Sequence, residues 1–308
     1  MRIAVFGAGG VGGHFGAQLA KAGHDVSFIA RGKHLAALRT HGLTVESAAA
    51  PVQLASVVAT DDPGSLGAVD VVMFCPKLWD VEAAAQQAAP LVAQGTVIPF
   101  QNGVESHEIL RRTLGAERVA GGVAHIAATI KAPGVIAHTG TLARLRVGAF
   151  PDAGAETKAR VQAFVDAGRA AGIDIDTVPD ITRALWEKFV FLVAFSGVTC
   201  LARQPAGVIR SEADLRATLL ASMEETVAVA LARGVSIERD LAAKQLTFVD
   251  NLPAEMRSSM LNDLTQGSRL EAPWLAGAVV RFAQALDLPA PVNRTLYAAM
   301  KPYLNGAS

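Results

Sequence analysis

A glycine-rich run near the N-terminus constrains the fold more than any other feature of the sequence. It follows the apolar segment Arg2–Phe6, precedes a helical stretch at Val11–Ala22, and so has the order strand, turn, helix. The run fits the spacing G-x-G-x-x-G and consists of Gly7, Ala8, Gly9, Gly10, Val11 and Gly12. Glycines at these positions permit a tight turn, a close approach to a pyrophosphate and close packing of helix on strand. We therefore predict a dinucleotide-binding unit, with the phosphates at the N-terminus of the helix.

The end of the next predicted strand, Asp25–Ile29, indicates which dinucleotide binds. Sites for NAD usually carry Asp or Glu here, and that carboxylate bonds the ribose 2′-hydroxyl. This chain has Arg31 instead, with Lys33 as a second cation. A guanidinium suits the 2′-phosphate of NADP, although Arg31 could also be a solvated loop charge. We predict NADPH/NADP as the cofactor.

Strands and helices alternate over about the first 150 residues, which favours a parallel sheet covered on both faces. The predicted strands are Arg2–Phe6, Asp25–Ile29, Val69–Cys75, Thr96–Phe100 and Val119–Ala124, and the helices between them include Val11–Ala22 and Val81–Leu91. Two further β-like segments, Val135–Thr139 and Arg144–Val147, are separated by a glycine-containing turn and predict an antiparallel addition. A helix at Glu156–Ala171 and a strand at Ile173–Val178 follow.

After Pro179 the pattern is helical, and proline and glycine residues separate the helices. The predicted helices are Ile181–Leu201, Glu212–Arg233, Arg239–Asp250 and Ala272–Leu286. We predict an α/β Rossmann-type NADP-binding domain over residues 1–178 and an all-α substrate and catalytic domain over residues 179–308.

The charge and the cysteine content limit which binding partners and which cellular compartment are expected. The 308 residues include 28 basic and 28 acidic side chains, so no net charge favours nucleic acid or an anionic membrane as partner. Cys75 and Cys200 lie in apolar runs without a CxxC partner, and the N-terminus lacks a secretory pattern, so we expect a cytoplasmic protein. The seven histidines show no metal-ligand spacing, and we expect no metal. Without a heptad seam, a homodimer is left open.

Two loops follow strands of the predicted parallel sheet at the edge where such sheets bind ligands. Lys77 lies in the loop after Val69–Cys75, and Asn102 lies in the loop after Thr96–Phe100. Both are candidate contacts to the cofactor ribose or to the substrate. An Asn-Gly pair such as Asn102-Gly103 is also an ordinary turn signal.

Lys188 and Glu271 are the candidate catalytic residues of the helical half. Lys188 precedes a long apolar run, where it could snorkel to solvent or point into a cleft and donate a proton to a carbonyl oxygen. Glu271 precedes an apolar helix, where a first-turn acid is favoured by the helix dipole. The residues alone leave these alternatives open.

The spaced motifs together resemble the ketopantoate reductase (2-dehydropantoate 2-reductase) family over essentially the whole chain. The matching pieces are the glycine run, Arg31-Gly32, Lys77, Gln101-Asn102-Gly103, Trp186-x-Lys188, and Ser258-Ser259-Met260-Leu261-x-Asp263 leading to Glu271. The resemblance implies a Rossmann domain followed by a helical domain with the active site between them. It also implies reduction of ketopantoate to pantoate, a step of pantothenate biosynthesis.

Family roles follow for the matched positions. Lys188 would be the proton donor, and Asn102 would touch both the nicotinamide and the substrate. Ser259 would bind the substrate, while Glu271 would bind on the cofactor side and help to fix the lysine.

The family's ketopantoate enzymes carry asparagines four and eight residues after the lysine and a third about ten residues further on, where this chain has Leu192, Ser196 and Ala206. Positions 188, 192 and 196 share one helix face, so Leu192 and Ser196 are expected to face the substrate without those amides. A site lacking them should not discriminate for a substrate hydroxyl.

Three functions are therefore weighed. The first is NADPH-dependent reduction of a 2-oxo acid of the ketopantoate type. The second is a reductase or D-2-hydroxy-acid dehydrogenase of the same family that acts on a more apolar carbonyl compound. The third is a non-catalytic NADP(H) sensor, which the presence of both Lys188 and Glu271 disfavours.

Overall fold

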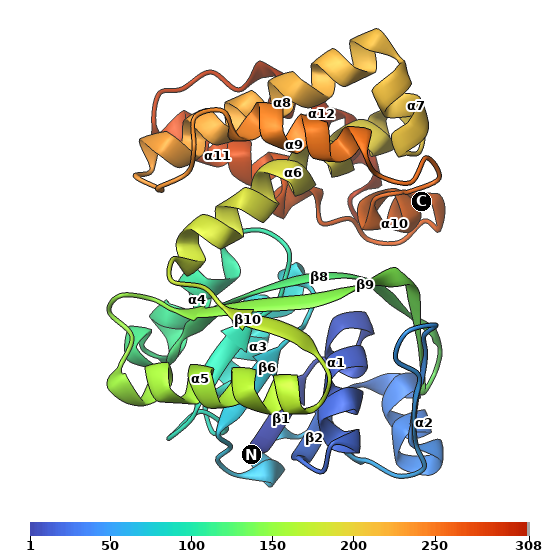
Figure 1. The fold of residues 1–308 in the computed structure, drawn as a ribbon, viewed down its shortest axis with the longest axis vertical. Coiled ribbons are helices and arrows are strands. Elements are labelled where there is room, and N and C mark those ends of the chain that lie inside the picture. The colour runs from blue at the N-terminus through green and yellow to red at the C-terminus, as the bar shows by residue number, and fades with distance from the viewer. Residues whose placement is uncertain (307–308) are drawn as a thin grey trace. The chain divides into compact units, whose positions relative to one another are not determined.

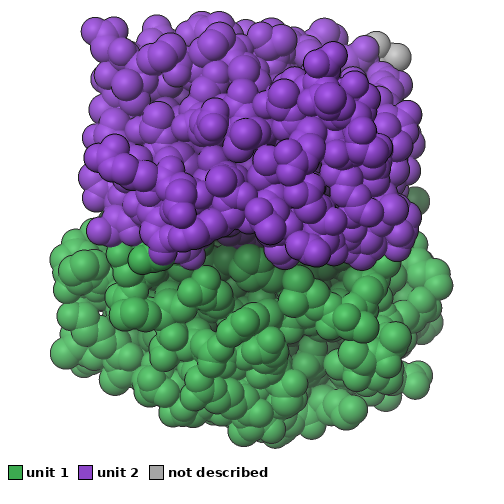
Figure 2. Space-filling model, turned by 45° about the horizontal axis from the view of Figure 1, so that its top comes forward, with its two compact units in different colours: residues 1–101, 105–184 green, residues 102–104, 185–308 purple. Residues whose placement is uncertain are grey.

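The computed structural model describes residues 1–306 and divides the chain into two compact units, coloured in Figure 2. Unit 1 comprises residues 1–101 and 105–184, and unit 2 comprises residues 102–104 and the chain from residue 185 onward. The division falls after Ala184, whereas the sequence placed it after Val178. The difference has a packing cause: Ile181, 1% exposed, lies against Gly121 and Gly148 of unit 1, so the first helical turn after Pro179 stays with that unit.

A five-stranded parallel sheet forms the centre of unit 1, and the α/β Rossmann-type prediction is confirmed. Its strand order is β5-β2-β1-β6-β7. The strands are β1 (Arg2–Phe6), β2 (Asp25–Ile29), β5 (Val58–Thr60), β6 (Val71–Phe74) and β7 (Thr96–Pro99). Strands β6 and β7 are buried at every position, as expected for strands covered on both faces.

Helix α1 (Gly10–Lys21) lies between this sheet and a second sheet of the same unit. It contacts β1 and β2 of the first sheet and β3, β4, β8 and β9 of the second. Small residues allow this double contact, since a Cβ atom at Gly13 would meet Ile136 at 2.8 Å and one at Gly16 would meet Val5 at 2.7 Å. The remaining helices of unit 1 are α2 (Gly32–His41), α3 (Val81–Ala88), α4 (Ser106–Leu114) and α5 (Ala155–Ala170), and α5 runs along β9 and β10 (Figure 1).

The second sheet has the order β10-β9-β3-β4, with β8 antiparallel to β9. Its strands are β3 (Leu43–Glu46), β4 (Val52–Leu54), β8 (Ala120–Ala132), β9 (Val135–Ala149) and β10 (Asp174–Thr177). The predicted turn between residues 139 and 144 is wrong, because β9 is one strand from residue 135 to residue 149. The turn lies at Pro133-Gly134, where Gly134 adopts φ +78°, a conformation that favours glycine. Short strands β3, β4 and β5 lacked enough periodicity to be predicted.

Over its described residues unit 2 is helical. It contains α6 (Ile181–Ala202, from Leu185 onward), α7 (Ala206–Ser211), α8 (Ala213–Ala232), α9 (Leu241–Asp250), α10 (Ser259–Thr265), α11 (Ala276–Ala285) and α12 (Pro291–Met300). The predicted helix Ala272–Leu286 is divided into a short 3-10 turn, η4 (Ala272–Trp274), and α11. Helices α7, α10 and α12 were not predicted, and α7 and α10, with six and seven residues, are too short for a clear apolar period.

Helix α6 is long and apolar enough to cross a membrane by length and composition alone. However, 72% of its most apolar window is buried inside the protein. Such burial is typical of the core helix of a soluble protein.

Candidate functional site

The glycine run of unit 1 forms the turn from β1 into α1. Gly7 has φ +94°, and a Cβ atom there would lie 2.8 Å from the carbonyl carbon of Cys75. A Cβ atom at Gly12 would lie 2.3 Å from the carbonyl oxygen of Gly7, so only glycine permits this packing of helix on strand. Above Gly9, by contrast, no atom lies within 4 Å of an added Cβ. The loop is closed on its protein side and open at Gly9, where the motif places the pyrophosphate.

The N-terminus of α1 is suited to an anion. Gly9 is its N-cap residue, no side chain caps the helix, and its first turn holds no acidic residue. The first N–H groups of a helix have no partner within the helix, and together with the dipole they attract phosphate. Residues Gly7 to Gly12 therefore fit a dinucleotide pyrophosphate.

The predicted cations of the cofactor site are exposed side chains of unit 1. Arg31, at the N-cap of α2, is 76% exposed and donates a 2.7 Å hydrogen bond to the Asp80 carboxylate. Lys77 follows β6, and its ammonium lies 5.5 Å from the centre of the Trp79 ring. Lys33 is exposed in the first turn of α2. Sequence reasoning did not identify Asp80 as a partner of Arg31, because a carboxylate 49 positions away gives no local signal.

Unit 2 brings together three of the predicted residues, which we call the Lys188 cluster: Asn102, Lys188 and Glu271. The Lys188 ammonium donates to Asn102 Oδ1 at 3.0 Å, and Asn102 Nδ2 donates to Glu271 Oε2 at 3.3 Å. The Asn102 amide thus links the lysine and the carboxylate. Gly103, with φ +86°, turns the chain after Asn102 against the Trp274 carbonyl, so the turn prediction and the ligand prediction for Asn102 are compatible.

The environment of Lys188 favours proton transfer. Burial lowers the pKa of its ammonium from 10.5 to about 8, and the negative charge of Glu271 opposes part of that shift. A 3.0 Å hydrogen bond to Asn102 holds this half-buried amine at the cluster rather than in bulk solvent, and the ammonium is still mostly charged at pH 7. A pKa near the working pH is what a general acid requires.

Glu271 does not cap the following helical turn with its side chain. The residue is 7% exposed, and its carboxylate accepts the hydrogen bond from Asn102. The geometry agrees with a role beside the lysine and gives no support to the alternative of a first-turn acid. The backbone oxygen of Glu271 accepts a hydrogen bond from the Trp274 amide in that turn.

Leu192 and Ser196 continue the Lys188 side of α6, one and two turns further along. Leu192 is half-buried, whereas Ser196 is fully buried and its hydroxyl has no hydrogen-bond partner. Ala206, at the position of the third family asparagine, is also fully buried. One turn from the lysine this face therefore carries the alkyl side chain of Leu192 and no amide, as the sequence predicts.

The serine pair before Met260 divides into a buried and an exposed residue. Ser259, the predicted substrate residue, is exposed at the start of α10. Ser258 is 4% exposed, caps α10 by accepting from the Leu261 amide, and lies 2.7 Å from the Thr199 hydroxyl. Sequence reasoning missed Ser258, although a serine just before a helical segment is a recognised N-cap signal.

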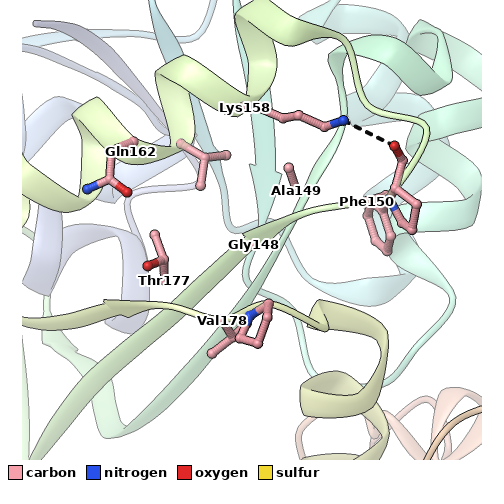
Figure 3. Close-up of a pocket in the computed structure, with 10 residues that line it drawn as sticks. Gly148, Ala149, Phe150, Lys158, Gln162, Thr177 and Val178 are labelled. Atoms are coloured by element: carbon pink, nitrogen blue, oxygen red, sulfur yellow. Dashed lines mark hydrogen bonds between the residues drawn. The ribbon is translucent and has the colours of Figure 1, made fainter.

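A hollow of about 460 Å³ lies elsewhere in unit 1, between α5 and the ends of β9 and β10 (Figure 3). Lys158, Gln162 and Thr177 are its polar lining, and Lys158 is engaged with the Pro151 carbonyl. None of the predicted site residues lines it.

The comparisons with known proteins agree on one family. Residues 3–152 match the model described as "Ketopantoate reductase PanE/ApbA", and residues 180–304 match "Ketopantoate reductase PanE/ApbA C terminal". The chain is 30% identical to "Uncharacterized oxidoreductase YkpB" of Bacillus subtilis, with 98% of this chain and 99% of that protein covered. It is 32% identical to the 2-dehydropantoate 2-reductase of Archaeoglobus fulgidus, with 96% and 95% covered.

Solved structures share the fold over 98% of the chain. The crystal structure of 2-dehydropantoate 2-reductase from Geobacter metallireducens matches with a TM-score of 0.90 and 30% identity, and covers 98% of this chain and 99% of that one. A ternary structure of D-mandelate dehydrogenase with NADH and anilino(oxo)acetate matches with a TM-score of 0.88, with 98% of each chain covered. At 19% identity, that second likeness concerns the fold alone.

Proposed function

Since the chain belongs to the ketopantoate reductase family, we propose that this oxidoreductase uses NADPH to reduce the carbonyl group of a 2-oxo acid, with Lys188 as proton donor. The observation that carries the proposal is the Lys188 cluster. A half-buried lysine with a lowered pKa donates to the Asn102 amide oxygen, and that amide donates to the buried Glu271 carboxylate.

The reduced dinucleotide supplies the hydride that is added to the carbonyl carbon. Lys188 Nζ gives its proton to the carbonyl oxygen, so that a hydroxyl group forms and a neutral amine remains. Asn102 orients the ammonium through Oδ1, and Glu271 stabilises its charged form until the proton leaves. In the opposite direction the neutral amine would act as the base that removes a hydroxyl proton.

For the cofactor, Gly7 to Gly12 would hold the pyrophosphate and Arg31 the 2′-phosphate of NADPH. The end of β2 carries no acidic residue that would favour NADH. The more distant D-mandelate dehydrogenase structure contains NADH, so the preference for NADPH in this chain rests on Arg31.

A more apolar substrate than ketopantoate is the second candidate, and the α6 face favours it. Leu192 replaces a family asparagine one turn from Lys188. Beside it, Phe191 packs on Phe248 with ring centres 5.3 Å apart, and Phe248 is 48% exposed. An alkyl and aromatic surface near the proton donor suits a 2-oxo acid with a bulky apolar substituent.

A panel of 2-oxo acids tests the substrate, with the loss of NADPH absorbance as the measurement. We expect kcat/KM to be higher for 2-oxoisocaproate and phenylglyoxylate than for ketopantoate. The variant Leu192→Asn should raise the ratio of kcat/KM for ketopantoate to kcat/KM for phenylglyoxylate by about three- to tenfold. This is the effect expected from one neutral hydrogen bond. Leu201→Asn is the matched control, since Leu201 is an exposed leucine of the same helix.

The preference for an apolar substrate would be contradicted if ketopantoate were reduced faster than the other acids and if Leu192→Asn left the ratio of kcat/KM for ketopantoate to kcat/KM for phenylglyoxylate unchanged. Turnover of ketopantoate would leave the reductase proposal intact. An absence of turnover with every acid of the panel would favour the non-catalytic sensor.

The pH profile of the reduction should report Lys188. Because the donor must be protonated, kcat/KM should be level below about pH 7 and fall above about pH 8 by about tenfold per pH unit. Oxidation of the corresponding 2-hydroxy acid should rise over the same range, because it needs the neutral amine. A reduction rate that stays level to pH 10 would contradict the assignment of the donor.

We place the enzyme in the cytoplasm. Its two cysteines, Cys75 and Cys200, are free thiols, and burial raises the pKa of each. Such thiols behave as inert core residues in a reducing compartment.

A further inference from the structure

The ion pair between Arg31 and Asp80 joins two loops of unit 1 across the end of β1. Arg31 follows β2 and Asp80 follows β6, and these two strands pair with β1 on its opposite sides. Because β1 ends at Phe6 and the glycine run starts at Gly7, the pair spans the edge of the sheet at the loop that would hold the pyrophosphate. The Arg31 guanidinium and the Asp80 carboxylate are 2.7 Å apart.

The pair contributes little to stability, because both partners are accessible to solvent. The Arg31 side chain is 76% exposed and the Asp80 side chain 34%. Exposed ion pairs are weak on average. Asp80 is also the N-cap residue of α3, but its side chain does not cap that helix. A role in binding explains the position of this carboxylate better than a role in folding.

Resting on the proposed function, we propose that Asp80 is a specificity-determining residue that reduces the preference of this site for NADPH over NADH. The Asp80 carboxylate pairs with the Arg31 guanidinium and so competes with the 2′-phosphate for it. Its negative charge also repels that phosphate. Toward NADH it is an acceptor for a ribose hydroxyl, the role that an acid at the end of the second strand has in NAD sites. The acid is supplied here by the neighbouring loop.

Equilibrium titration of the full chain with NADPH and with NADH, followed by nicotinamide fluorescence, tests the proposal. Asp80→Asn keeps the size and an acceptor oxygen but removes the charge. We expect the Kd for NADPH to fall by about five- to tenfold, the effect of removing one solvent-screened charge beside the phosphate. The Kd for NADH should stay the same or rise. The gain should shrink at 1 M salt, because screening weakens the repulsion.

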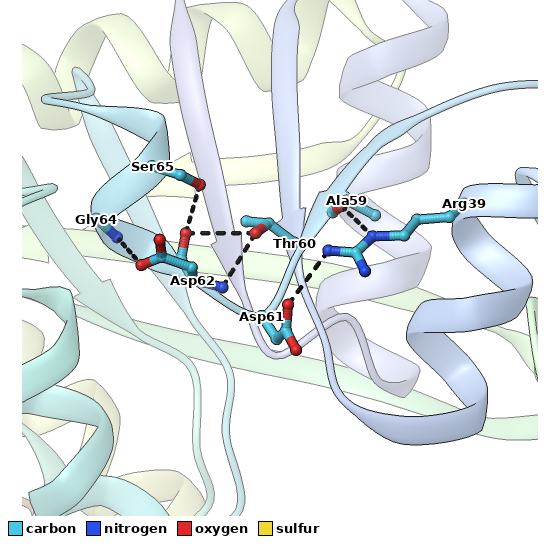
Figure 4. Close-up of polar contacts among 7 residues, drawn as sticks. All are labelled: Arg39, Ala59, Thr60, Asp61, Asp62, Gly64 and Ser65. Carbon is cyan, nitrogen blue, oxygen red and sulfur yellow. Dashed lines mark hydrogen bonds and ion pairs between the residues drawn. The ribbon is translucent and has the colours of Figure 1, made fainter.

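A second ion pair of unit 1 provides the matched control. Arg39 donates to Asp61 at 3.2 Å, and both side chains are exposed (Figure 4). Asp61→Asn makes the same change of charge next to an arginine and should leave both dissociation constants unchanged. Arg31→Gln should weaken NADPH binding and reduce the effect of Asp80→Asn in the double variant, because only the direct repulsion of the phosphate by Asp80 would remain.

Equal changes in Asp80→Asn and Asp61→Asn would overturn the proposal, since net charge alone would then explain them. An unchanged ratio of the two dissociation constants in Asp80→Asn would also overturn it, with the reductase function left standing. If the unaltered protein bound neither dinucleotide, the proposed function itself would fail. Thermal unfolding of each variant checks that the fold is retained.

Discussion

Replacement of Lys188 by alanine should lower the reduction rate by about 100- to 10,000-fold, the usual contribution of a positioned general acid. The variant removes the only ammonium of the Lys188 cluster and leaves Asn102 and Glu271 in place. Water is a weaker acid and is not held at the carbonyl oxygen. The Kd for NADPH should stay nearly constant, because the pyrophosphate loop and Arg31 belong to unit 1. Steady-state kinetics and fluorescence titration measure the two quantities.

Two further variants make this result specific. Lys188→Arg keeps the positive charge but should be almost as slow, because a guanidinium does not release its proton near neutral pH. Lys244→Ala removes an exposed lysine of α9 that pairs with Glu238 and Asp240, and it should retain full activity. Normal turnover in Lys188→Ala would exclude this lysine as the proton donor.

Replacement of Gly9 by aspartate should abolish dinucleotide binding, with a rise in Kd of about 100-fold or more, and leave the fold intact. Gly9 has φ −78° and ψ −157°, an extended conformation open to any residue, and its added Cβ would meet nothing within 4 Å. The new carboxylate would occupy the space above the loop and repel the pyrophosphate. Titration with NADPH and calorimetric unfolding are the measurements.

The melting temperature of Gly9→Asp should stay within about 2 °C of the unaltered protein. Ala163→Asp, at an exposed position of α5, is the charge-matched control and should bind NADPH normally. Gly12→Ala should behave in the opposite way, with a lower melting temperature, because its Cβ would lie 2.3 Å from the Gly7 carbonyl oxygen. Unchanged NADPH binding in Gly9→Asp would show that the dinucleotide does not use this loop.

The regular elements were predictable wherever a local pattern was long and unambiguous. Strands β1 and β2 have the predicted bounds, and α6 differs from its prediction by one residue at its end. Prediction was poorest for short elements such as β3 to β5 and α10, whose residues carry too few periods to define a face. The turn of the β8–β9 hairpin was predicted near Gly140, but the chain turns at Gly134, and Gly140 lies within the continuous strand β9 although it also adopts positive φ.

The sequence by itself determined the dinucleotide loop, because a turn from strand to helix depends on contacts between near neighbours. It also identified Lys188 and Glu271 as candidate catalytic residues. Only the tertiary structure decided how these side chains are used. Asn102 bonds Lys188 across 86 positions and Glu271 across 169, and Arg31 is held by Asp80 across 49. Contacts of that range are set by packing of the whole unit, and so is the burial that lowers the pKa of Lys188.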